Sequence, residues 1–232
     1  MGVVSPILLP DIAILDAALT TGLPASTTAA TGVDAMVHAT EAYTSKNRKN
    51  PLSDALSREA LSLLSKNIHT AVHDPTNIDA RQNMLLGSMM AGMSFANAPV
   101  AAVHALAYPI GGHYKVPHGM SCSLMFSTVM RFNSEKSPAA AKLYAEIAPI
   151  VFPHLDASGM DEELAFAMVD GLNQLAIELE MPTTLKDVGI PSDAVDMMAS
   201  DAMLQTRLLV NNPVEVTEAD AAVLYRQIGG WA

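Results

Sequence analysis

The sequence has 232 residues, a formal net charge of −11 and 50% hydrophobic residues, which is enough apolar material for a substantial core. The negative charge speaks against a nucleic-acid partner, because phosphate binding needs clustered lysine and arginine. Its single cysteine, Cys122, excludes an intrachain disulfide and favours a cytoplasmic protein, and no apolar run reaches the ~18 to 20 residues of a membrane crossing. Neither a nucleic acid nor a membrane is therefore expected as a partner.

The predicted elements are almost all helical, because alanine, leucine and methionine are plentiful while aromatic residues make up only 5%. Only the opening, to about residue 15, reads as extended, since it is a short apolar run broken by Pro6 and Pro10. The predicted helices cover, in chain order, about residues 26–46, 50–74, 77–98, 99–112, a segment starting at His118, 138–152, 160–180, 192–208 and a last helix from Thr217, which opens with the capping pattern Thr217 and Asp220.

Two of these helices carry further signals. Asn50 and Pro51 form a favoured N-cap and first residue, and apolar residues at three- and four-residue steps predict one buried stripe: Leu52, Leu56, Ala60, Leu63, Leu64 and Ile68. The segment from 99 ends in Pro109 and a Gly111–Gly112 pair, which predict a helix stop. With no internal repeat and no Gly/Ser linker, the sequence predicts an all-α helical bundle with a short extended N-terminal lead-in.

Asp34 and His38 lie four residues apart on one predicted helix, so their side chains project from the same face. Their neighbours are apolar, which indicates a buried helix where an unpaired aspartate is costly. A carboxylate–histidine hydrogen bond inside the core explains this pair as well as cation binding does.

His104 and His118 stand on either side of the predicted break, the first near the end of one helix and the second at the start of the next. A fold-back there can bring both rings to one point, whereas a continuous helix would separate them by about 21 Å. Taken alone, two such histidines are more often structural than ligating.

The remaining histidines carry less signal. His69 and His73 share the four-residue spacing, but they fall off the apolar stripe and beside Arg58 and Lys66, so we interpret them as solvated surface residues. His154 stands alone in an expected loop.

Together, Asp34, His38, His104 and His118 form a donor set suited to Fe²⁺ or Zn²⁺. One carboxylate and three neutral imidazoles leave a +2 ion with a net charge of +1, and such an ion remains a Lewis acid. A closed structural zinc site would more usually recruit cysteines, of which only Cys122 is present, four residues after His118. The set therefore indicates a catalytic metal site.

Three segments resemble the iron-containing alcohol dehydrogenase family: "TAATGVDAMVHATEAYTS", "GMSFANAPVAAVHALAYPIGGHYKVPHG" and "RFN" at 131–133. The resemblance covers almost the whole chain. It implies an oxidoreductase whose helical domain, of the dehydroquinate-synthase-like C-terminal type, binds Fe²⁺ or sometimes Zn²⁺ through Asp34, His38, His104 and His118. The metal polarises the oxygen of an alcohol or aldehyde, and a hydride passes to or from NAD(P).

The resemblance also assigns roles around the metal. Phe95 matches a position that faces the substrate cleft, although a core aromatic would look the same. Tyr108 stands where many members carry a second histidine near the nicotinamide, so Tyr108 and His118 are candidate cofactor contacts. Because the ordinary pKa of tyrosine, ~10, makes it a poor base at neutral pH, both Tyr108 and His113 are candidates for the proton relay.

A larger departure from the family is the N-terminal nucleotide-binding α/β domain, which these 232 residues do not include. We interpret residues 1–15 as the extended crossing between domains and residues 16–232 as the helical metal-binding domain. Since most of the cofactor site is missing, we expect very weak or absent dehydrogenase activity from this chain alone.

Two alternatives stay open. One is a zinc-dependent relative resembling glycerol dehydrogenases, although these typically use fewer histidine ligands. The other is a non-catalytic helical fragment that associates through an exposed apolar surface. In either case a homo-oligomer is expected, and the sequence does not identify the alcohol.

Overall fold

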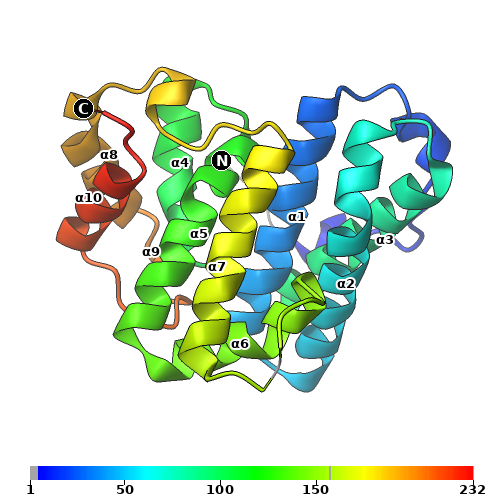
Figure 1. Cartoon of the computed structure of the whole chain (residues 1–232), viewed down its shortest axis with the longest axis horizontal. Coiled ribbons are helices and arrows are strands. Elements are labelled where there is room, and N and C mark those ends of the chain that lie inside the picture. The colour runs from blue at the N-terminus through cyan, green and yellow to red at the C-terminus, as the bar shows by residue number, and fades with distance from the viewer. Residues whose placement is uncertain (1–4, 157, 232) are drawn as a thin grey trace.

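The computed structural model describes residues 5–156 and 158–231. Within these residues the chain forms ten α-helices joined by loops and 3₁₀ turns, without a β-strand (Figure 1). The predicted all-α bundle is confirmed. The helices are α1 (Ala25–Thr44), α2 (Pro51–His73), α3 (Ile78–Asn97), α4 (Ala102–Tyr114), α5 (His118–Lys136), α6 (Pro138–Val151), α7 (Asp161–Glu178), α8 (Val195–Met203), α9 (Thr206–Leu209) and α10 (Glu218–Gln227).

Helix α1 lies at the centre of the bundle, between α5 and α7 on one side and α2 and α3 on the other (Figure 1). Val33, Met36, Val37 and Ala39 are all buried, although they point in different directions around the helix. A helix enclosed in this way carries small and apolar residues on almost every face. Polar side chains on α1 must therefore find partners inside the protein, because burial without them is costly.

Helix α2 begins as predicted, since the Asn50 side chain accepts hydrogen bonds from the backbone N–H groups of Leu52 and Ser53. The first part of its predicted apolar stripe is wrong, because Leu52 was expected to be buried. Leu52 is exposed, and the buried positions are Ser53 and Ser57. Ser57 Oγ lies 2.7 Å from Ser94 Oγ of α3, so a hydroxyl pair replaces apolar packing where these two helices meet.

Helix α4 does not stop where Pro109 and the two glycines predict. It continues to Tyr114 and ends at Lys115, which has a left-handed backbone with φ of 58°. Proline removes the hydrogen bond to the carbonyl four residues earlier and its ring crowds that carbonyl, so the helix needs packing to continue past it. Leu106 and Ile110, on either side of Pro109, are fully buried, and their packing holds the helix together across the break.

The predicted helix over 192–208 is divided in the structure. A 3₁₀ turn (Ser192–Ala194) leads into α8, and the chain turns again at Leu204, whose exposed side chain offers no packing to hold a continuous helix. The predicted capping box at the start of α10 is confirmed, because Thr217 Oγ1 accepts from the backbone N–H of Asp220. Tyr225 of α10 donates to the carbonyl of Leu106 at 2.6 Å, which fastens α10 to α4.

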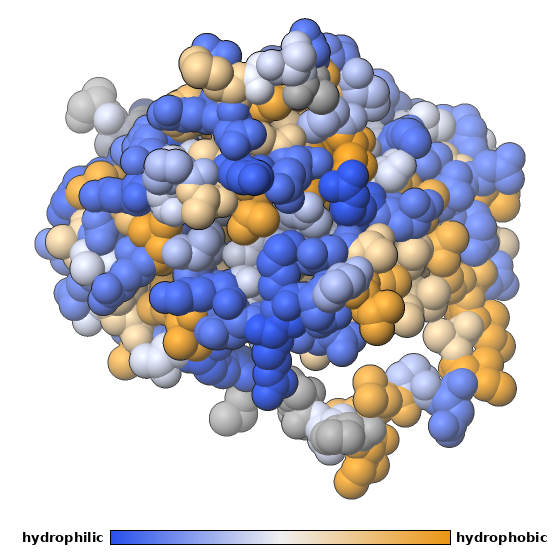
Figure 2. Space-filling model, turned by 90° about the horizontal axis from the view of Figure 1, so that it is seen from below, coloured by the Kyte–Doolittle hydropathy of each residue, from blue (hydrophilic) through white to orange (hydrophobic). Residues whose placement is uncertain are grey.

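The lead-in is irregular rather than uniformly extended. Residues 1–4 lie outside the described residues, and a 3₁₀ turn (Pro6–Leu8) follows. The apolar side chains of the next residues face outward, and Figure 2 shows apolar residues at the lower edge set off from the main body. In the described part of the chain no single helix has the length and apolar character of a membrane crossing. Helices α3 and α4 have that length and apolar character only when taken together, and this pair is bent by 109°.

Candidate metal centre

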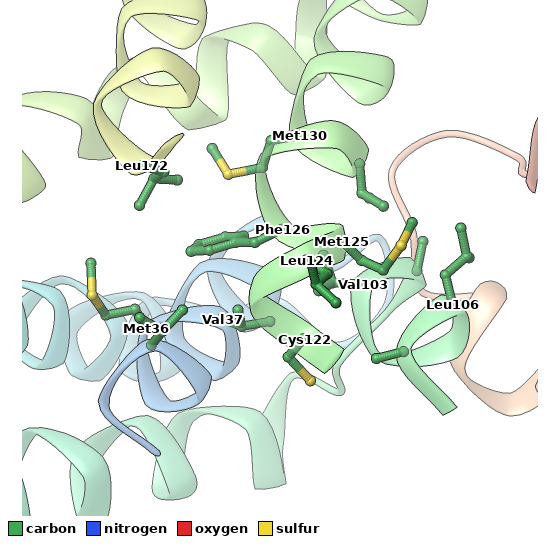
Figure 3. Packing of buried hydrophobic residues seen from close by; sticks show 14 of the residues in the cluster. Met36, Val37, Val103, Leu106, Cys122, Leu124, Met125, Phe126, Met130 and Leu172 are labelled. Atoms are coloured by element: carbon green, nitrogen blue, oxygen red, sulfur yellow. The ribbon is translucent and has the colours of Figure 1, made fainter. Parts of the chain in front are cut away.

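Helix α1 contributes three ionisable side chains to one face. Asp34, His38 and Glu41 are spaced four and three residues apart, so they lie above one another along the helix. Val37, beside His38, belongs to the packed apolar cluster (Figure 3). The face that carries the polar groups is therefore bordered by apolar packing that limits the access of water.

His104 and His118 approach this face from two other helices. His104 lies in the first turn of α4, not near the end of a helix as predicted, because α3 ends at Asn97 and the chain is irregular before Ala102. His118 is the first residue of α5. The expected fold-back is confirmed, since the two ring centroids are 5.4 Å apart.

The four predicted ligands meet around the Asp34 carboxylate. Asp34 Oδ1 lies 3.7 Å from Nε2 of His104 and 3.7 Å from Nε2 of His118. Asp34 Oδ2 lies 3.8 Å from Nε2 of His38. These separations are too long for hydrogen bonds. They are close to the separation of about 3.4 Å between neighbouring donors of a tetrahedral ion with bonds of about 2.0 to 2.1 Å.

Glu41 orients His104 and was missed by the sequence analysis. Its Oε2 lies 2.6 Å from His104 Nδ1, and the carboxylate also accepts from the backbone N–H groups of Ala101 and Val103 at 2.9 and 2.7 Å. A carboxylate can only accept here, so Nδ1 carries the hydrogen, and in the neutral ring Nε2 keeps its lone pair on the side of Asp34. The signal was available in the sequence, because Glu41 follows Asp34 by seven residues, two helical turns on the same face.

Two buried atoms of this site lack a hydrogen-bond partner among the described residues: Asp34 Oδ1 and His104 Nε2. Buried polar atoms are almost always paired. These two face each other, and one is anionic while the other has a free lone pair. That combination fits a shared divalent cation, so the residues present are suited to the metal that the sequence predicts.

The protonation state of His38 agrees with this interpretation. Burial lowers the pKa of His38 to about 4, so the ring is neutral at pH 7 and its lone pair is free. Burial also acts to lower the pKa of His104, but the hydrogen bond and charge of Glu41 outweigh it and raise the pKa. Glu41 thus favours the protonated form of His104, in which Nε2 carries a second proton. A metal ion would compete with that proton for Nε2.

Cys122 also belongs to this cluster. The cluster of donor atoms that all lie within 4.8 Å of one another comprises Asp34, His104, His118 and Cys122. Cys122 Sγ is 3.7 Å from His118 Nε2, one helical turn along α5. His38 is outside this tightest group but remains beside the second oxygen of Asp34.

The other predicted site residues surround the cluster unevenly. The ring of Phe95 packs on His38 with centroids 4.6 Å apart, and the ring of Tyr108 lies 6.0 Å from that of His118. Tyr108 and His118 both line an open cavity of about 820 Å³ with Gly112, Gln205 and Arg207. Cofactor or substrate could approach the donors from this side, since His118 is the most exposed of them at 48%.

The remaining histidines lie elsewhere. His113 Nε2 pairs with Asp201 of α8, a contact that the sequence did not predict. His69 and His73 are exposed on α2, as predicted, and their ring centroids are 4.4 Å apart with the rings tilted by 50°. His154 lies in a loop, with its ring 6.0 Å from that of Phe152.

Comparison with known proteins identifies the family of this chain. Residues 28–229 match the model of the Fe-containing alcohol dehydrogenase family, C-terminal part. The chain is 38% identical to long-chain-alcohol dehydrogenase 1 of Geobacillus thermodenitrificans, over 94% of this chain and 54% of that protein. It is 34% identical to the 1,3-propanediol dehydrogenase of Klebsiella pneumoniae, over 94% and 55%. The chain thus spans about half the length of the curated relatives that it matches.

Solved structures agree in fold. A 1,3-propanediol oxidoreductase superposes with a TM-score of 0.86 at 34% identity, over 92% of this chain and 54% of that one. The sulfoacetaldehyde reductase of Bifidobacterium kashiwanohense, solved with NAD⁺, gives 0.85 at 28% identity, over 99% and 57%. The helical bundle and the family match together lead to one conclusion: this chain belongs to the iron-containing alcohol dehydrogenase family and corresponds to its C-terminal domain.

Proposed function

We propose that this chain is the metal-binding, substrate-side domain of an NAD(P)-dependent alcohol dehydrogenase. The observation that carries the proposal is the meeting of Asp34 with the imidazoles of His38, His104 and His118, drawn from three helices. Two buried atoms that face each other without a hydrogen-bond partner among the described residues support it further.

When bound, Fe²⁺ or Zn²⁺ would supply a Lewis acid that polarises the oxygen of an alcohol or aldehyde. The chain's own residues prepare this site. Asp34 contributes one negative charge, and His38 is neutral because burial lowers its pKa to about 4. Glu41 holds the Nδ1 hydrogen of His104, which keeps the Nε2 lone pair directed at Asp34.

The open cavity beside His118 is the proposed approach for substrate and nicotinamide. Phe95 packs on His38 and would form an apolar wall for the substrate. Tyr108 lines the cavity with His118, so its hydroxyl is the proposed proton relay and both residues are proposed nicotinamide contacts. His113 is the weaker relay candidate, since its ring is paired with Asp201.

The substrate class follows from the relatives. Proteins named for long-chain alcohols and for 1,3-propanediol share more than a third of their aligned residues with this chain, and we propose that its substrate is also a small-molecule alcohol or aldehyde. The nicotinamide proposal is supported by a sulfoacetaldehyde reductase of similar fold that was solved with NAD⁺. A cytoplasmic location is part of the proposal and rests on the free, buried Cys122, because such thiols are typical of reducing compartments.

The ligand roles can be tested by metal analysis after anaerobic purification. We expect Asp34→Ala and His118→Ala to lower the bound Fe²⁺ or Zn²⁺ from about one ion per chain to near zero, because each removes a donor from the cluster. His69→Ala, on the exposed face of α2, is the matched control and should keep full occupancy. Equal loss in all three variants would show that general destabilisation had been mistaken for ligation.

A further inference from the structure

Cys122 lies in the metal cluster although the proposed ligand set does not use it. Its side chain is fully buried, and Figure 3 shows it at the edge of the apolar cluster with its sulfur pointing away from Phe126 and Met130. The sulfur instead approaches His118, four residues earlier on the same helix. Residues at this spacing project from one helix face, so both can bind the same ion.

The distances suit a common ion. In a tetrahedral zinc site, bonds of about 2.0 to 2.1 Å to nitrogen and about 2.3 Å to sulfur place neighbouring nitrogen and sulfur donors about 3.6 Å apart. Cys122 Sγ and His118 Nε2 are 3.7 Å apart, and Asp34 Oδ1 is 3.7 Å from both His118 and His104. All four donor atoms lie within 4.8 Å of one another, so small side-chain movements would bring them all to bonding distance of one ion.

The surroundings also point to a ligand for this sulfur. Asp34 Oδ1 and His104 Nε2, the second with a side chain 3% exposed, have no hydrogen-bond partner among the described residues and face the same point as the thiol. We propose that Cys122 binds the metal as a thiolate and makes this centre selective for zinc over iron. The inference rests on the proposed metal function, and in the zinc-bound centre Cys122 takes the tetrahedral position that the first ligand set gave to His38.

Binding replaces the S–H bond with a metal–sulfur bond, and the proton leaves to solvent. The charge of the centre then falls from +1 to zero, since a +2 ion is shared by one carboxylate and one thiolate. Thiolate is a soft ligand that favours zinc, whereas imidazole and carboxylate alone suit iron as well. His38 lies beside the other oxygen of Asp34 and outside this tightest group of donors.

Substitution with cobalt tests the inference in the intact 232-residue chain. Co²⁺ bound to a thiolate gives a near-ultraviolet charge-transfer band, besides the visible bands of the ion in any site. Because the sequence contains one cysteine, that band has a single source. We expect it in the wild-type chain and expect its loss in both Cys122→Ser and Cys122→Ala, with the visible bands kept.

Competition between metals gives the second measurement. We expect Cys122→Ser to weaken Zn²⁺ binding by about tenfold or more, since even partners outside the ligand shell contribute 10- to 100-fold. Fe²⁺ binding should change by less. Ser123→Ala, one residue along α5, is the matched control and should bind both metals as the wild type does.

The outcomes separate the two proposals. Visible cobalt bands without the charge-transfer band in the wild-type chain would overturn the role of Cys122 and leave the metal site standing. No bound Co²⁺ at all would overturn both. The wild-type spectrum decides the matter even where a variant fails to fold.

Discussion

Glu41 performs two tasks with one carboxylate. It accepts a hydrogen bond from His104 Nδ1, and it also accepts from the backbone N–H groups at the start of α4. The N-cap residue of α4, Ala101, has no side chain that could accept these bonds. Carboxylates at a helix N-terminus are favoured by the unpaired N–H groups and by the helix dipole. Glu41 therefore both caps the start of α4 and orients the ring of His104 toward Asp34.

Replacing Glu41 by glutamine should weaken metal binding by about 10- to 100-fold, because the imidazole loses the carboxylate that holds its tautomer. The amide keeps the shape of the side chain, so the chain should still fold. Competition with a chelator measures the affinity, and Glu59→Gln, exposed on α2, is the matched control. Unchanged affinity in Glu41→Gln would mean that the charge of Glu41 does not contribute to metal binding through His104.

At the scale of elements, the position of His118 depends on how closely α5 approaches α1. A Cβ atom at Gly119 would lie 2.2 Å from the carbonyl oxygen of Ala30, which is backbone and cannot move aside alone. Ala30 stands one turn before Asp34 on α1. Glycine at 119 therefore lets the first turn of α5 contact α1 and places His118 against the Asp34 carboxylate.

We expect Gly119→Ala to lower the free energy of unfolding by about 1 to 3 kcal/mol, the usual cost of overpacking, and to reduce metal binding as α5 is pushed away. Gly92→Ala on α3 is the control with the opposite sign. A Cβ there has no neighbour within 4 Å, so alanine should raise the free energy of unfolding by about 0.5 to 1 kcal/mol. Urea denaturation measures both, and a neutral Gly119→Ala would contradict the close approach.

At the scale of the whole molecule, the lead-in leaves an unusual amount of apolar surface in solvent. Ile7, Ile12 and Ile14 are 91%, 81% and 86% exposed. Contiguous apolar surface of this kind marks an interaction site or an association hazard. The homo-oligomer expected from the sequence would use this surface, and so would the alternative of a helical fragment that associates without catalysis.

If this segment mediates association, Ile12→Asp combined with Ile14→Asp should shift the mass measured by light scattering toward that of one chain. Two buried charges in place of two apolar side chains would make an interface through this segment unfavourable. Leu52→Asp, at an isolated exposed leucine on α2, should leave the mass unchanged. A wild-type chain that is already monomeric would remove the homo-oligomer proposal.

Part of the site could be predicted from the sequence because it depends on local spacing. Asp34 and His38 share a helix face at four residues. A fold-back between His104 and His118 was also expected, but it lies at residues 115–117 and not at the Pro109–Gly112 break. His104 was assigned to the wrong end of its helix, and α4 runs through Pro109. The first error arises because α4 begins only at Ala102, and the second because the burial of Leu106 and Ile110 outweighs the local breaking tendency of proline.

The sequence alone determined the helical class, the family resemblance and the four expected ligands, because composition, periodicity and short motifs act through neighbouring residues. Only the tertiary structure decided that Glu41 reaches His104 across 63 positions and that Cys122 shares its surroundings with Asp34. These relations depend on how α1, α4 and α5 cross. Crossing geometry follows from the packing of whole helices, which a local pattern does not encode.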